Sequence, residues 1–234
     1  MILKPLTKHI PSFFKDTTDF LRKLPRNTNK DIILTTFDVE SLYSNITHEL
    51  GLEALQLWIN KHRNEIPSRF SDEFILESME YILKNNTFKF NNIFFRQIRG
   101  TAMGTKVAPT FSTLTIAYLE DKLYKEVATT FGMSFSKTFI ESWKRYLDDC
   151  FLLWTRTEEE LLLLHKMLNN LNTHINFTME FDRQELPFLD RKFIKDGEII
   201  QTDIFYKPTD SKTYLLFSSC HSKHTKVNIP FSRF

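Results

Sequence analysis

Glycine, cysteine and long apolar runs are scarce in this sequence of 234 residues. The two cysteines, Cys150 and Cys220, are too few for a disulfide framework and are typical of a reducing compartment. The first residues lack the apolar segment of a signal peptide, and no apolar run approaches the length of a transmembrane helix. These absences argue against the disulfide-rich class and the helical membrane class. Internal repeats and low-complexity segments are absent from the sequence as well.

Apolar material, in contrast, is plentiful. Hydrophobic residues make up 41% of the chain and include 23 phenylalanines, which is enough for a packed core and too much for a disordered chain. The net charge of +2 is unevenly distributed, because residues 1–31 carry seven Lys/Arg against three Asp and residues 203–234 carry five against two. The middle of the chain is therefore acidic. Basic ends around an acidic centre fit a chain that binds phosphates and holds cations, although charge runs alone are usually solvated surface.

The spacing of apolar residues predicts an α+β fold with antiparallel hairpins rather than a doubly wound sheet. The helices that we expect lie at 17–24, around Leu52 to Ile59, from the N-cap Ser71 through Leu83, from Pro109 onward, and from the capping box at 157–160 to 171. The strands that we expect lie at 31–37, 174–181, 188–194 and 198–206. Hairpin turns are predicted at Asn91-Asn92, Asp148-Asp149 and Asp196-Gly197.

Three aspartates lie next to the ends of predicted strands. Asp38 follows the strand at 31–37, and Asp148 and Asp149 lie between two aromatic and aliphatic runs, 110 residues after Asp38. Adjacent acids in a poorly hydrated setting repel each other unless a cation is present. A solvated turn for the acid pair, and a helix or turn cap for Asp38, are the simpler interpretations of each feature taken alone.

A loop at 97–109 contains two of the five glycines, Gly100 and Gly104, and leads into the helix that begins at Pro109. Glycines before a helix N-terminus allow close approach of a base or a phosphate. The loop is not a Walker loop, because Gly-Lys-Ser/Thr does not occur in it. Two acid-bearing strands and such a loop together are the parts that two-metal phosphoryl transfer with Mg²⁺ requires.

Three segments resemble the palm motifs of reverse transcriptases: FDVESLYSNI at 37–46, GTAMGTKVAP at 100–109 and YLDD at 146–149. Three further segments resemble blocks of the reverse transcriptases of Penelope-like retroelements: LPFLD at 186–190, YKPT at 206–209 and CHSKHTK at 220–226. The resemblance implies a polymerase palm with an antiparallel sheet packed on helices, partial fingers and the start of a thumb. It implies a remnant of the fingers or entry segment at 1–30, the palm at 31–206 with a fingers insertion at about 47–97, and the start of the thumb or connection at 207–234.

The resemblance also implies roles for particular residues. Asp38 and Asp148 would be the main ligands of two Mg²⁺ ions, with Mn²⁺ as a substitute, Val39 would contribute its backbone carbonyl, and Asp149 would support them. Tyr43 would exclude a 2′-hydroxyl. The residues that would position the nucleotide and template are Met103, which stands where many retroviral-type enzymes have Gln, and Gly104, Lys106, Ala108 and Pro109. Tyr146 and Leu147 would support the acid pair.

The implied function is an RNA-directed DNA polymerase of a retroelement, with an RNA template, a DNA primer and deoxynucleotides as partners, and with nuclear residence. Two alternatives stay open. Little sequence precedes and follows the palm motifs, which would fit a truncated remnant that only binds nucleic acid, and another palm-type polymerase would carry similar motifs. The tail at 207–234 combines basic and aromatic residues, a composition found in nucleic-acid-binding segments and in ordinary surface segments. Cys220, His221 and His224 have ligand-like spacing but lack a fourth partner, so we assign no zinc there.

Overall fold

A four-stranded antiparallel sheet forms the centre of the computed structural model, which describes residues 2–25, 27–28, 31–209, 215–216 and 218–228. The strands run in the order β4-β5-β1-β6. Their bounds are Ile33–Val39 for β1, Lys144–Tyr146 for β4, Asp149–Trp154 for β5 and Phe177–Asp182 for β6. Because β1 lies between β5 and β6, both of its edges are paired along its length.

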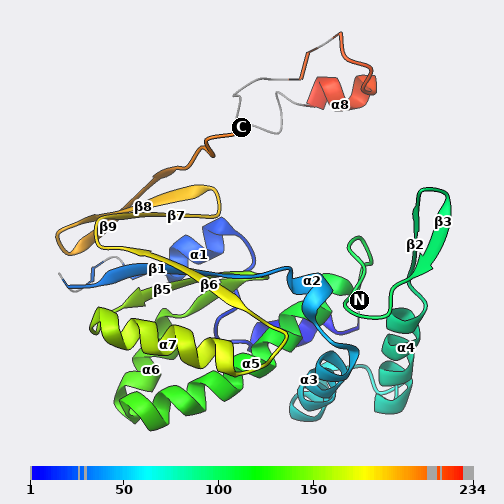
Figure 1. The fold of residues 1–234 in the computed structure, drawn as a ribbon, viewed down its shortest axis with the longest axis horizontal. Coiled ribbons are helices and arrows are strands. Elements are labelled where there is room, and N and C mark those ends of the chain that lie inside the picture. Colours follow the sequence, from blue (N-terminus) through cyan, green and yellow to red (C-terminus); the bar gives the residue numbers. More distant parts are fainter. Residues whose placement is uncertain (1, 26, 29–30, 210–214, 217, 229–234) are drawn as a thin grey trace.

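The two faces of this sheet are covered by different elements (Figure 1). One face packs on α5 (Ala108–Phe131), α6 (Met133–Ser142) and α7 (Glu158–Asn170). The other face lies against α1 (Thr17–Lys23) and a second sheet. Strand alternation produces the division, since successive side chains point to opposite faces. Phe37 and Val39 accordingly belong to the helical core, whereas Leu34 belongs to the core under the second sheet.

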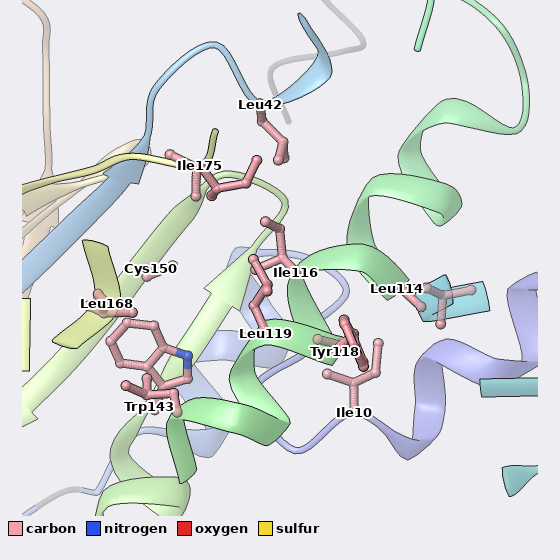
Figure 2. Close-up of a cluster of buried hydrophobic side chains, with 14 of the residues drawn as sticks. Ile10, Leu42, Leu114, Ile116, Tyr118, Leu119, Trp143, Cys150, Leu168 and Ile175 are labelled. Atoms are coloured by element: carbon pink, nitrogen blue, oxygen red, sulfur yellow. The ribbon is translucent and has the colours of Figure 1, made fainter. Parts of the chain in front are cut away.

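The helical core is built around α5, whose middle is buried on nearly all sides. Figure 2 shows Ile116 and Leu119 of this helix among Trp143 at the end of α6, Cys150 of β5 and Leu168 of α7. The predicted capping box is present: the Thr157 hydroxyl accepts from the Glu160 N–H, and the Glu160 carboxylate accepts from the Thr157 N–H. This capping confirms the predicted start of α7.

The segment between β1 and α5 forms three α-helices and a hairpin, and α3 and α4 share the core of α5. Its elements are α2 (Leu42–Asn45), α3 (His48–Lys61), α4 (Asp72–Lys84), β2 (Thr87–Phe90) and β3 (Ile93–Arg96). Ser71 caps α4 as predicted, because its hydroxyl accepts from the Phe74 N–H at 3.1 Å. Asn91 and Asn92 have φ values of +46° and +63°, which suit a type I′ turn and confirm the predicted Asn-Asn hairpin.

The second sheet consists of β7 (Glu185–Phe188), β8 (Arg191–Asp196) and β9 (Ile199–Ile204). The hairpin predicted at Asp196-Gly197 is present, but its two turn residues are Gly197, at φ +60°, and Glu198, because Asp196 is the last residue of β8. The prediction of one strand at 188–194 is wrong, because the chain reverses between Phe188 and Arg191, with Leu189 at φ +55°. This second turn consists of Leu189 and Asp190 and contains no glycine, so its sequence signal is weaker than that of a turn with glycine.

Two strand boundaries and one helix also differ from the prediction. Strand β1 continues through Asp38 to Val39, because Asp38 pairs with both neighbouring strands. Strand β6 begins at Phe177 rather than at His174, since the Asn169 side chain bonds both the N–H and the carbonyl of Phe177 and the N–H of His174 bonds the Asn172 side chain. Helix α6 was not predicted.

Short helical segments complete the described chain: η1 (Lys4–His9), η2 (Arg63–Glu65) and α8 (Lys223–Asn228). Of the predicted basic tail, residues 210–214, 217 and 229–234 lie outside the described residues. Within the described ranges, no helix combines the length and the apolar character needed to cross a membrane.

Candidate active site

Two acid-bearing segments meet at one end of the central sheet. Asp38 on β1 and Asp149 on β5 are direct partners in the antiparallel register. Asp148 lies in the two-residue turn between β4 and β5, and its backbone carbonyl accepts a hydrogen bond from the Val39 N–H at 3.2 Å. The prediction of both acids at the turn is therefore only half right, since Asp149 is the first residue of β5. The structure brings together Asp38, Val39, Asp148 and Asp149.

The carboxylates of this group raise one another's pKa. The pKa of Asp149 is raised to about 6, first by loss of hydration and then by the charges of Asp148 and Asp38, while Lys207 opposes the shift. The pKa of Asp38 is also raised, first by partial desolvation of its carboxyl and then by Asp148 and Glu40. Each ionised carboxylate thus makes ionisation of its neighbours harder, so the group favours a bound cation.

A pocket of about 180 Å³ opens beside Asp38 and Asp149. Thr178 and Glu180 of β6 line it, and so does the turn that follows β7. Thr178 and Glu180 were not predicted as site residues. They lie one and three residues after the first residue of β6, a spacing that places them on the same face, but only the pairing of β6 with β1 brings them beside Asp38.

Tyr43 lies on α2, close to the acid turn. Burial raises the pKa of its phenol, and the charges of Asp148 and Tyr146 raise it further, which places the ring in their electrostatic environment. The chain reaches α2 through Ser41, which adopts φ +48°, a left-handed conformation that turns the chain out of β1. The backbone therefore places Tyr43 near Asp148, although the two residues are distant in sequence.

The glycine loop is attached to α2 at its beginning. The N–H groups of Gly100 and Thr101 donate to the carbonyls of Ile46 and Tyr43 at 3.1 and 2.7 Å. Gly100 has φ +77°, and a β-carbon there would lie 2.8 Å from the Cα of Ser44. Gly100 is thus required by close backbone approach. This contact with α2 was not predicted for Gly100.

The remaining predicted loop residues divide into two groups. Met103, Gly104 and Lys106 are exposed, whereas Ala108 is buried and begins α5. Pro109 is exposed and shares a pocket of about 210 Å³ with Tyr146 and Leu147. The helix start and the acid turn are therefore adjacent, while the structure leaves Met103, Gly104 and Lys106 facing solvent.

The donor set at the acids fits a hard divalent cation. Carboxylate and carbonyl oxygens are the ligands of Mg²⁺ and Mn²⁺, and Mg²⁺ usually takes only one or two carboxylates together with water and substrate phosphates. Over the part of the chain that the structure describes, no three acid, histidine or cysteine side chains are grouped tightly enough to form a complete metal site. That finding covers Asp38 with Asp148 and Asp149, and also Cys220 with His221 and His224.

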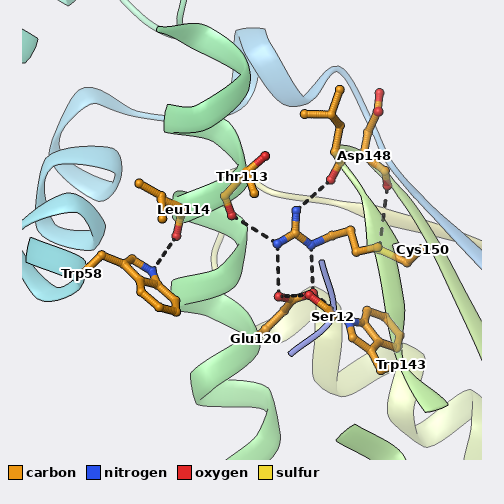
Figure 3. A network of polar contacts seen from close by, with 10 residues as sticks. Ser12, Trp58, Thr113, Leu114, Glu120, Trp143, Asp148 and Cys150 are labelled. Atoms are coloured by element: carbon orange, nitrogen blue, oxygen red, sulfur yellow. Dashed lines mark hydrogen bonds and ion pairs between the residues drawn. The ribbon is translucent and has the colours of Figure 1, made fainter. Parts of the chain in front are cut away.

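A buried polar network behind the acid turn is a further feature that the sequence analysis did not find. Arg145 and Glu120 form an ion pair in the core, and Figure 3 shows the network extending to Ser12, Thr113 and Trp143. Charged residues in a core are almost always paired, and a charged residue within an apolar helix pattern is the sequence signal that could have marked Glu120.

Solved structures with the same fold include polymerases. A telomerase from Candida tropicalis, truncated from its C-terminal domain, matches with a TM-score of 0.63 and 12% identity over 87% of this chain and 44% of that chain. A telomerase from Candida albicans, in complex with a fragment of telomeric RNA, matches with a TM-score of 0.61 and 12% identity over 86% and 38%. An RNA polymerase complex inside a double-stranded RNA virus matches with a TM-score of 0.57 and 10% identity over 82% and 19%.

These likenesses confirm the predicted fold class, a mixed helical and antiparallel palm. The chain spans less than half the length of each of these proteins. A search among curated proteins finds no match. The family model described as "Reverse transcriptase (RNA-dependent DNA polymerase)" matches residues 1–182, well over half of the chain. The chain therefore belongs to the reverse transcriptase family.

Proposed function

We propose that this chain is the palm region of an RNA-directed DNA polymerase that adds deoxynucleotides to the 3′-hydroxyl of a primer. The observation that carries the proposal is the meeting of Asp38 with Asp148 and Asp149 on neighbouring strands. Membership of the reverse transcriptase family supports the reaction class. In this proposal, residues 31–206 are the palm, 47–97 are its fingers insertion, 1–30 are part of the fingers or entry segment, and 207–234 begin the thumb.

Asp38, Asp148 and Asp149, with the backbone carbonyl of Val39, would hold two Mg²⁺ ions or Mn²⁺ in their place. When bound, such ions lower the pKa of an attacking hydroxyl and neutralise charge on the leaving pyrophosphate. The raised pKa of Asp149 supports this assignment, since a divalent cation would offset the repulsion among the carboxylates.

The surrounding residues of the chain would orient the substrates. Tyr43, half-buried near Asp148, would pack under the sugar and exclude a 2′-hydroxyl. Gly104, Ala108 and Pro109 would position the incoming nucleotide and the template base, and Met103 and Lys106 would contact the nucleotide from the same loop. Tyr146 and Leu147 would support the acid turn from the side of the pocket that they share with Pro109.

We further propose that the polymerase belongs to a Penelope-like retroelement, acts on an RNA template and resides in the nucleus. The supporting residues are the blocks at 186–190, 206–209 and 220–226. One of the telomerases with this fold is in complex with a fragment of telomeric RNA, which agrees with an RNA partner.

The test is primer extension on an RNA template with Mg²⁺ and deoxynucleotides. We expect the parent chain to extend the primer, and we expect Asp148→Asn to reduce extension at least about 1,000-fold, because a neutral amide is a poor Mg²⁺ ligand. Asp196→Asn, the same change in the β8–β9 hairpin, is the matched control and should retain parental activity. Activity of Asp148→Asn equal to that of the control would reject the proposal. Salt-dependent RNA binding without synthesis by any variant would favour the alternative function, nucleic-acid binding alone.

A further inference from the structure

A buried ion pair lies directly behind the turn that carries Asp148. The side chains of Arg145 and Glu120 are 0% and 3% exposed. Nε of Arg145 donates to Oε1 of Glu120 at 2.8 Å, and Nη2 donates to Oε2 at 3.1 Å. This is the two-point geometry in which a guanidinium and a carboxylate fix each other's orientation. The pair joins α5 to β4, the strand that leads into the turn.

Additional donors hold Glu120 in place. Nε1 of Trp143 donates to Oε1 at 2.7 Å, and the hydroxyl of Ser12 donates to Oε2 at 2.7 Å. Each carboxylate oxygen therefore accepts two hydrogen bonds. The N–H of Arg145 also donates to the Ser12 carbonyl at 2.8 Å. A buried network whose members are all satisfied is rigid, so Arg145 has one defined position.

The guanidinium of Arg145 reaches the turn itself. Its Nη2 donates to the Thr113 carbonyl on α5 at 3.1 Å, and its Nη1 donates to the Leu147 carbonyl at 3.1 Å. On the other side of the turn, the Val39 N–H holds the Asp148 carbonyl at 3.2 Å. Both carbonyls that flank the Cα of Asp148 are thus bonded. Because peptide groups are planar, fixing these two groups fixes the direction of the Asp148 side chain.

A general property of buried ion pairs and the conformation of Leu147 both argue that the pair positions the turn and does not only stabilise the fold. A buried ion pair is often no more stabilising than apolar side chains of similar volume, so stability does not require one here. Leu147 adopts φ +54°, a conformation that is uncommon for residues other than glycine and persists where surrounding contacts enforce it. The bond from Arg145 to the Leu147 carbonyl is such a contact.

We propose that Arg145 and Glu120 are positioning residues that hold the Leu147–Asp148 turn so that the Asp148 carboxylate lies beside Asp38. The catalytic consequence rests on the proposed function, whereas the effect on the turn does not. The turn can therefore be tested in the full 234-residue chain without nucleotide incorporation.

Amide hydrogen exchange of Val39, whose N–H is bonded to the turn, measures the turn directly. The variant is the double substitution Glu120→Leu with Arg145→Met, which keeps volume and removes both charges. We expect exchange at Val39 to accelerate at least about tenfold, while the Lys195 N–H, bonded to the Gln184 carbonyl at 2.7 Å in the second sheet, stays within about twofold of the parent. The affinity for Mn²⁺ should fall at least about tenfold, as it does when groups that orient metal ligands are lost.

A second variant covers the case in which the double substitution does not fold. Arg145→Lys keeps a positive charge beside Glu120 but cannot bond Glu120, Thr113 and Leu147 together. We expect it to fold and to accelerate exchange at Val39. Trp58→Phe is the matched control, because it removes an equally buried bond to α5, from Nε1 to the Leu114 carbonyl at 3.0 Å, far from the turn. It should leave exchange at Val39 and Mn²⁺ affinity at parental values.

The outcomes separate this inference from the proposed function. Parental exchange at Val39 in a folded Arg145→Lys variant would overturn the positioning role, even if the parent polymerises. Equal acceleration at Val39 and Lys195 would also overturn it, since it would indicate general loss of stability. If the parent synthesises DNA, Arg145→Lys should lower kcat about 100-fold with little change in KM, because misplacement of a metal ligand affects the transition state. Accelerated exchange in a chain without synthesis would support the positioning role and count against the polymerase.

Discussion

At the scale of single residues, the acids are placed where their charges oppose one another. We expect an effect on stability from Asp149, because its pKa of about 6 lies well above the ordinary value of 3.8. A carboxyl with a raised pKa binds its proton more tightly in the folded chain than in the unfolded chain. Its contribution therefore favours folding at low pH and is lost as the pH rises from about 4 to about 6. Above that range the ionised acids destabilise the fold until a cation binds.

The first prediction follows from this linkage. With metal chelated, Asp149→Asn should increase the free energy of unfolding at pH 7.5 by about 1–2 kcal/mol, below the full value of about 3 kcal/mol because solvent screens a half-buried site. Below pH 4 the variant and the parent should differ little. Urea unfolding at pH 7.5 and at pH 3.8 measures both values. A gain that is the same at both pH values would contradict the assigned charge repulsion.

The second prediction concerns Tyr43 and separates polymerases that use deoxynucleotides from those that do not. Tyr43→Ala should raise the incorporation of ribonucleotides relative to deoxynucleotides at least about tenfold, because the ring no longer fills the space of a 2′-hydroxyl. Single-nucleotide primer extension measures the ratio. Tyr81→Ala, at a tyrosine that is 70% exposed on α4, is the control and should leave the ratio unchanged. An unchanged ratio for Tyr43→Ala would remove Tyr43 from the sugar-contacting role.

At the scale of elements, the loop and α2 behave as one unit. The third prediction is that Gly100→Ala destabilises the fold by about 2–4 kcal/mol, because it combines strain at φ +77° with a collision against the backbone of Tyr43 and Ser44. Gly132→Ala has a similar φ of +93° but open space around it, and should cost only about 1 kcal/mol. Urea unfolding of both variants isolates the collision. Equal losses would show that the loop can move away from α2.

At the scale of the whole molecule, cation binding should be coupled to stability. The fourth prediction is that 10 mM Mg²⁺, taken as about ten times a millimolar Kd, raises the Tm of the parent by about 2–4 °C. The double variant Asp38→Asn with Asp148→Asn should show no such rise, because it lacks both proposed ligands. Calorimetry measures the shift, with NaCl of equal ionic strength as the control for screening. A rise of the same size in the double variant would place the cation elsewhere.

Much of the local structure could be read from short stretches of sequence. Ser71, the capping box at Thr157 and the turn residues Asn91 and Gly197 were interpreted correctly because capping and turn formation depend on a few adjacent residues. The turn at Leu189 and helix α6 were missed, although Asp190 lies in that turn and Gly132, at φ +93°, separates α6 from α5. Tertiary packing holds Leu189 in a conformation that its own sequence disfavours.

For the candidate site, too, some features could be predicted from the sequence and others depend on tertiary contacts. The sequence by itself determined most of the longer helices, the hairpin at Asn91-Asn92 and, through resemblance to reverse transcriptases, which acids are the candidates. Only the tertiary structure decided that Asp38 pairs with Asp149, that Gly100 packs on α2, and that Arg145 with Glu120 holds the acid turn. Those contacts join residues that are far apart in the chain. They depend on strand register and on burial, which local patterns do not encode.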